Sequence, residues 1–86
     1  MEIKKELVKR NIAGDIILVP IGNASLEIKG LITLNEAAEI IWDALPSAES
    51  VADLVKAITD FYEIDDATAK HDVNEFLEKL RELDII

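Results

Sequence analysis

The spacing of apolar residues changes only once along this chain, close to Leu34. Before that residue, aliphatic runs and an alternation of apolar and polar residues predict β-strands. After it, apolar residues recur every three or four positions, which is typical of amphipathic helices. Residues 34–42 lie where the two patterns meet. One such change within 86 residues predicts a single α+β domain spanning residues 1–86, with the sheet first and the helices after it.

The residues before Leu34 predict a three-stranded antiparallel meander. Residues 7–12 alternate loosely and end at Ala13-Gly14, and the aliphatic run 16–19 follows. Pro20 is expected at the end of this second strand, because a proline inside a central strand removes a hydrogen-bond donor from the sheet. Gly22-Asn23 predicts a second tight turn, since both residue types tolerate a positive φ angle.

The third strand is expected over residues 25–33, where polar and apolar residues alternate with a period of two. In a meander this strand lies at the edge of the sheet, so one row of its N–H and C=O groups is unpaired. A visiting extended peptide can add to such an edge. Alternatively, Glu27, Lys29 and Gly30 are protective residues on an edge that binds nothing.

Three helices are expected after the meander. The first begins near Asn35, capped either by Asn35 itself or by a capping box of Thr33 and Glu36. The second is capped by Ser50, and the third begins after Asp65 or Asp66. The positions expected to face the core are Ala38, Ile41, Trp42, Leu45, Val51, Leu54, Val55, Ile58, Phe61, Ala69, Val73, Phe76, Leu77, Leu80 and Leu83. The final pair Ile85-Ile86 is expected to dock on the same core.

The third predicted helix is asymmetric around its apolar stripe. At 100° per residue, Lys70, Asn74 and Arg81 border one flank of the stripe, and acidic residues border the other. If the basic flank faces the third strand, the two elements form a groove with apolar walls and a cationic rim. The alternative is ordinary pairing of side chains along an exposed helix surface.

The distribution of charge disfavours nucleic acid as a partner. Residues 1–33 hold five basic and four acidic residues, whereas residues 34–86 hold four basic and 14 acidic ones. Affinity for nucleic acid comes largely from neutralising phosphates, and the helical part would repel them. No apolar run approaches the ~18 residues of a membrane helix. Cysteine is absent, which fits a reducing cytoplasm and excludes disulfides and thiolate metal sites.

No catalytic constellation is found in the sequence. His71 is the only histidine, and it lies on the face of its helix opposite the apolar stripe, so we expect a solvated side chain. The three glycines are spaced apart at turn or strand positions, so no phosphate-binding loop is expected. We therefore expect no enzymatic activity, no metal and no cofactor.

The order and spacing of these features resemble the coenzyme PQQ synthesis protein D (PqqD) family over nearly the whole chain. The matching positions are Arg10-Asn11, the hairpin from Ile16 to Gly22, Leu34-Asn35, Ala38, Ile41-Trp42, Leu54-Val55, Ile58, Phe61-Tyr62, Asp72-Val73, Phe76-Leu77, Leu80 and Ile85-Ile86. Asp84 departs from the pattern, because the family often has a glycine just before the final apolar pair. The closing turn is therefore expected to differ.

The resemblance implies a winged-helix-like peptide-binding domain that holds the leader segment of a ribosomally made precursor peptide. Such a domain presents the precursor to a modifying enzyme, often a radical SAM maturase. The leader adds to the third strand and lies against the third helix. The contact residues implied are Leu26, Glu27, Ile28, Lys29 and Gly30 from the strand, and Lys70, Val73, Asn74, Leu77 and Arg81 from the helix.

Two other classes of function stay open at this level. A winged-helix transcription regulator has the same order of elements, although its recognition helix would be basic. A structural assembly subunit would show a large apolar patch and no affinity for peptides. The exposed strand edge is also compatible with a homodimer.

Overall fold

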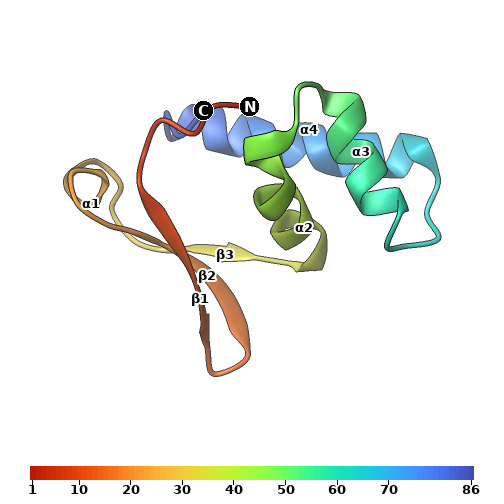
Figure 1. The fold of residues 1–86 in the computed structure, drawn as a ribbon. Coiled ribbons are helices and arrows are strands. Elements are labelled where there is room, and N and C mark those ends of the chain that lie inside the picture. The colour runs from red at the N-terminus through yellow and green to blue at the C-terminus, as the bar shows by residue number, and fades with distance from the viewer.

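The computed structural model describes residues 1–86 and shows a meander followed by helices, as predicted (Figure 1). The strands are β1 (Leu7–Ile12), β2 (Asp15–Pro20) and β3 (Ile32–Leu34). The helices are α1 (Ala24–Glu27), α2 (Glu36–Ala44), the 3-10 turn η1 (Leu45–Ser47), α3 (Val51–Thr59) and α4 (Asp66–Glu82). None of these helices has the length and apolar character that crossing a bilayer would require.

The β1–β2 hairpin sets the register of the sheet. Ala13 and Gly14 connect the two strands with φ angles of 53° and 89°, and positive φ at both central residues is what a two-residue hairpin turn favours. Leu7 pairs with Pro20 at the other end, so the proline lies at the end of β2 as predicted. Strand β2 is central in the order β1-β2-β3, and Leu18 pairs with Ile32.

The prediction for the third strand is wrong over most of its length. Only Ile32–Leu34 forms a strand, and the one-turn helix α1 follows Gly22 in place of a tight turn. The backbone N–H of Ile28 donates to the carbonyl of Ala24 at 2.8 Å, which closes this helical turn. Alternation therefore failed here because a single helical turn also buries Ile28 while it leaves Leu26 78% exposed.

The three longer helices begin at the residues that the capping rules predict. The side chain of Asn35 accepts a hydrogen bond from the N–H of Ala38 at 2.8 Å, so Asn35 caps α2 directly. Ser50 caps α3 by accepting from the N–H of Asp53, and Asp65 caps α4 by accepting from the N–H of Thr68. Hydrogen bonds from Thr68, first from its side chain and then from its backbone N–H, lower the pKa of Asp65, because they stabilise the carboxylate.

One apolar core joins the helices to the sheet. Leu18, Ile32 and Leu34 point from the sheet into a cluster of 17 buried residues that also contains Trp42 and residues of α2, α3 and α4. Phe61 is an exception to the predicted core, since its side chain is 74% exposed. Helix α3 ends at Thr59, so Phe61 lies in the following turn and no longer follows the helical period.

The C-terminal residues close the core against the N-terminal segment, and the two ends of the chain lie close together in Figure 1. Ile85 is fully buried, as predicted, and its carbonyl accepts a hydrogen bond from the N–H of Lys4 at 2.6 Å. Asp84 has a φ of 56°, the left-handed conformation that glycine adopts readily. The closing turn is therefore a glycine-type turn that is made by an aspartate.

Candidate functional site

The outer edge of β3 is unpaired. In the sheet order β1-β2-β3, this strand pairs on one side with β2 only. No other backbone hydrogen bond involves Ile32, Thr33 or Leu34. The free N–H and C=O groups of this edge are a template for another extended chain. The edge is short, however, so any guest strand needs further contacts to bind firmly.

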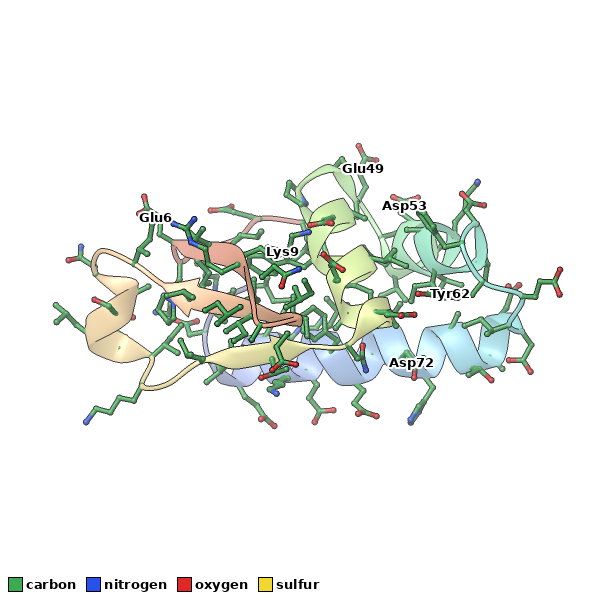
Figure 2. All side chains as sticks on the ribbon, turned by 90° about the horizontal axis from the view of Figure 1, so that it is seen from below. Glu6, Lys9, Glu49, Asp53, Tyr62 and Asp72 are labelled. Carbon is green, nitrogen blue, oxygen red and sulfur yellow. The ribbon has the colours of Figure 1, made fainter.

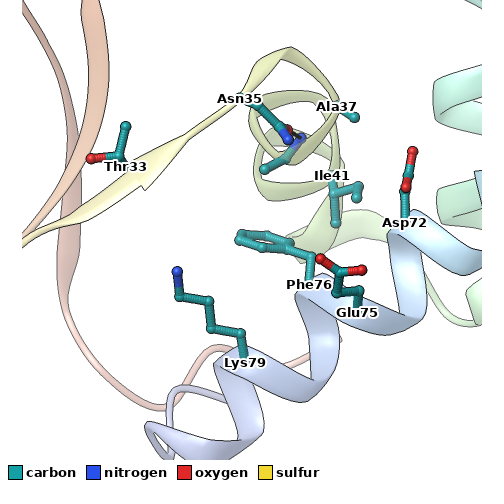
Figure 3. A pocket seen from close by; sticks show the side chains of 9 residues that line it. Thr33, Asn35, Ala37, Ile41, Asp72, Glu75, Phe76 and Lys79 are labelled. Atoms are coloured by element: carbon teal, nitrogen blue, oxygen red, sulfur yellow. Dashed lines mark hydrogen bonds between the residues drawn. The ribbon is translucent and has the colours of Figure 1, made fainter.

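Helix α4 supplies a wall beside this edge. A hollow of about 160 Å³ lies between β3, the start of α2 and α4 (Figure 3). Since one water molecule occupies about 30 Å³ in the liquid, the hollow has room for one amino-acid side chain. It is lined by Thr33, Asn35, Ala37, Ala38, Ile41, Asp72, Glu75, Phe76 and Lys79.

The floor of the hollow is apolar and its rim is charged. Ile41 and Phe76 are 1% and 8% exposed, and the ring of Phe76 points from α4 toward β3 in Figure 3. Lys79 extends its side chain from the same helix toward the strand. Asp72 and Glu75 lie further toward the N-terminus of α4. This arrangement suits an extended peptide that buries one apolar side chain and meets charges of both signs.

The rim charges are largely free to meet a ligand. Neither Lys79 nor Asp72 makes an ion pair or a side-chain hydrogen bond within the protein. Glu75 lies 3.2 Å from the ring of His71, which is charged only when protonated and is highly exposed, as predicted. No group of histidine, aspartate or glutamate side chains is arranged to hold a metal ion.

Ion pairs hold the hairpin against the helices that frame the hollow. The ammonium group of Lys9 on β1 lies 2.8 Å from carboxylate oxygens of both Glu39 and Asp43 on α2. These hydrogen bonds raise the pKa of Lys9, and the one to Asp43 has a larger effect than the one to Glu39. Lys5 likewise pairs with Glu27 of α1, which raises the pKa of Lys5. Lys9 therefore joins β1, at the opposite edge of the sheet from β3, to α2.

The five predicted strand contacts lie before β3 and not on it. Leu26 and Glu27 belong to α1, and Ile28 is buried in the core with 6% exposure. Lys29 and Gly30 are exposed in the segment that leads into β3. None of the five lines the hollow beside α4. Gly30 lies nearest to the strand edge in the chain, and a role of these residues in binding stays a prediction.

The predicted helix contacts divide between the core and another surface. Val73 and Leu77 are fully buried. Lys70 lines a separate, mostly apolar hollow between α3 and α4, together with Val55 and Lys56. The condition for the predicted groove, that the basic flank of α4 faces β3, is not met at this hollow, because Asp72, Glu75 and Lys79 line it. The reason is the position of α2. Because α2 packs on α4, the strand β3 that precedes α2 lies beside the acidic flank of α4.

Sequence reasoning missed Thr33, Asp72, Glu75 and Lys79 as site residues. Thr33 was within the predicted strand, where its exposed side chain between buried Ile32 and Leu34 marks the solvent side of β3. Nothing in the local sequence marks Asp72, Glu75 and Lys79 as site residues, because both flanks of α4 border the same apolar stripe. Only the packing of α2 decides which flank faces the strand edge.

The fold and the groove define a class of protein: a winged-helix-like α+β domain with an open strand edge beside its last helix. The sequence pattern of the family "Coenzyme PQQ synthesis protein D (PqqD)" matches residues 16–86, and the chain belongs to this family. No curated protein matches the chain significantly in sequence.

Among solved structures, the fold is similar to that of "TbiB1 in Complex with the TbiA(beta) Leader Peptide", with a TM-score of 0.72. The two chains are 22% identical, and the match covers 99% of this chain and 93% of that one. This similarity confirms the predicted fold over almost the full length.

Proposed function

We propose that this chain is a non-enzymatic recognition domain, spanning residues 1–86, that binds the leader segment of a ribosomally made precursor peptide. The observation that carries the proposal is the unpaired edge of β3 beside the hollow on α4. Membership in the PqqD family supports it, as does the likeness to a domain that was solved with a leader peptide.

The geometry supports binding by strand addition. A leader segment that pairs with Ile32–Leu34 would extend the sheet by one strand and would lie against α4. Each backbone hydrogen bond of this kind contributes about 0.5–1.5 kcal/mol net. Because β3 is only three residues long, an apolar side chain in the hollow over Ile41 and Phe76 would supply much of the remaining affinity.

The proposed role is presentation of the peptide to a separate modifying enzyme, such as a radical SAM maturase. Asp72, Glu75 and Lys79 line the groove without forming a nucleophile–base pair, so we assign the chemistry to the partner enzyme. Because ribosomes make the precursor in the cytoplasm, we place the protein there.

The groove is tested by filling it. Ala37 is the second residue of α2 and lines the hollow, and Ala67 is the second residue of α4 and does not line it. Replacing each with Phe adds the same side chain at the same helix position. Dodecapeptides selected from a random displayed library on the wild-type protein serve as probes in calorimetric titrations.

We expect Ala37→Phe to weaken binding by about tenfold or more, a loss of about 1.4 kcal/mol, and Ala67→Phe to leave it within about twofold. The far-UV circular dichroism of both variants should match that of the wild type. A library that yields no binding peptide, or peptides that bind both variants equally well, would contradict the proposed function.

A further inference from the structure

The groove beside β3 continues past the start of α2. A second hollow lies there, lined by Asn35, Glu36, Ala37, Ile58, Tyr62, Ile64 and Asp72. Asn35, Ala37 and Asp72 line both hollows. A peptide strand that leaves β3 at Leu34 and runs on in the same direction would therefore enter the second hollow across these three shared residues.

The second hollow joins an apolar wall to an acidic rim. Ile58 is fully buried, and Tyr62 and Ile64 are half-buried beside it. The hydroxyl of Tyr62 donates to a carboxylate oxygen of Glu36 at 2.6 Å. This hydrogen bond raises the pKa of Tyr62, so the phenol stays neutral. No lysine or arginine lines this hollow.

Asp72 is the one half-buried carboxylate of the protein that has no partner. Among the acidic residues, only Glu39 and Asp72 are half-buried, and all the others are exposed. Glu39 pairs with Lys9 at 2.8 Å, whereas Asp72 makes no hydrogen bond or ion pair within the chain. Figure 2 shows Asp72 on α4 and Tyr62 on the side of α3. A cationic side chain bound between the two hollows would therefore meet a half-buried carboxylate that has no partner within the chain.

The charges along α4 are ordered along the path of the peptide. Lys79 is near the β3 end of the groove, and Asp72 lies seven residues earlier on the helix. At 1.5 Å per residue these two positions are roughly 10 Å apart along the axis. An extended chain covers that distance in roughly three residues.

We infer that the groove selects peptides with a Lys or Arg at the junction of the two hollows, where its side chain pairs with Asp72. The residues before it pair with β3, and an acidic side chain roughly two to four positions away meets Lys79. The inference rests on the proposed function and adds to it the charge pattern of the peptide. It also differs from the sequence analysis, in which the rim of the groove would be cationic.

The test compares peptide selections on three forms of the protein. Random displayed dodecapeptides are selected on the wild type, on Asp72→Asn and on Glu78→Gln. Glu78 is the matched control, because it lies on the same helix, is exposed and lines neither hollow. A fourth selection uses Asp72→Lys, and the single tryptophan, Trp42, reports in each case whether the protein is folded.

We expect the wild type and Glu78→Gln to enrich Lys or Arg at one fixed position of the aligned peptides. Asp72→Asn should lose this enrichment, and Asp72→Lys should enrich Asp or Glu at the same position. Wild-type peptides should bind Asp72→Asn at least about fivefold more weakly, with unchanged affinity for Glu78→Gln.

Two results overturn the inference and are distinguishable. In the first, peptides bind and Ala37→Phe weakens their binding, but the selected peptides show no enriched Lys or Arg, or the enrichment persists with Asp72→Asn. The charge assignment is then wrong and the proposed function stands. If no peptide is enriched, or if binding ignores Ala37→Phe, the proposed function and the inference fail together.

Discussion

Replacing Leu77 with Ala tests whether this side chain packs in the core, as the structure shows, or contacts the peptide, as the resemblance to the family implied. Leu77 is fully buried within the 17-residue core, whereas the resemblance to the family placed it among the peptide contacts. Truncating a buried leucine costs about 2–5 kcal/mol, because transfer free energy is lost and a cavity remains. We expect about 3 kcal/mol here, since α4 packs on both α2 and α3.

This loss is large for so small a domain. At roughly 0.05–0.15 kcal/mol per residue, the whole chain is expected to be stable by about 4–13 kcal/mol. For a domain of this size, 1 kcal/mol shifts the melting temperature by about 4–8 °C. Leu77→Ala should therefore lower it by roughly 12–24 °C.

The assay is urea unfolding followed by the fluorescence of Trp42, which is 9% exposed in the core. With a slope of about 1 kcal/mol per molar urea, the midpoint should fall by about 3 M in Leu77→Ala. Asn74→Ala, an exposed change one turn away on α4, should stay within about 0.5 kcal/mol of the wild type. An unchanged midpoint together with lost peptide affinity would refute the core role of Leu77.

Three further predictions follow from the structure. Asp84→Gly should stabilise the protein by about 1 kcal/mol in thermal melts, because Asp84 has a positive φ; destabilisation would contradict this. Asp65→Ala should destabilise at neutral pH, and the difference should vanish as the pH falls below 3.8 through the lowered pKa of Asp65; a constant difference would contradict it. The double variant Lys70→Glu with Arg81→Glu should leave peptide affinity unchanged in calorimetry, whereas the sequence-based contacts predict weaker binding.

Features that depend on a few neighbouring residues could be predicted from the sequence. Asn35, Ser50 and Asp65 each cap the helix that was expected to follow, because a capping side chain bonds to a backbone group three residues on. The end of β2 at Pro20 has an equally local cause, since proline cannot donate to the sheet. Membership in the family was also visible in the order of these elements.

Features that depend on long-range packing could not be predicted. The alternation at residues 25–29 fits a strand and equally a single helical turn that buries Ile28, and only the packed structure distinguishes them. The orientation of α4 has the same origin. Its two flanks border one apolar stripe, and the contact with α2 turns the flank of Asp72 and Lys79 toward β3. Binding of a peptide between β3 and α4 therefore stays a prediction, and none of the predicted contact residues lines the hollow that the structure places there.

The most direct measurement of the central claim is amide hydrogen exchange at β3 with and without a selected peptide. We predict that those amides of Leu31–Leu34 that are not bonded to β2 exchange rapidly in the free protein and are protected when the peptide is bound. Amides of β1 should not change, since this strand lies at the opposite edge of the sheet from β3. Binding without any gain of protection at β3, or with protection confined to α3 and the Lys70 flank of α4, would contradict strand addition at this edge.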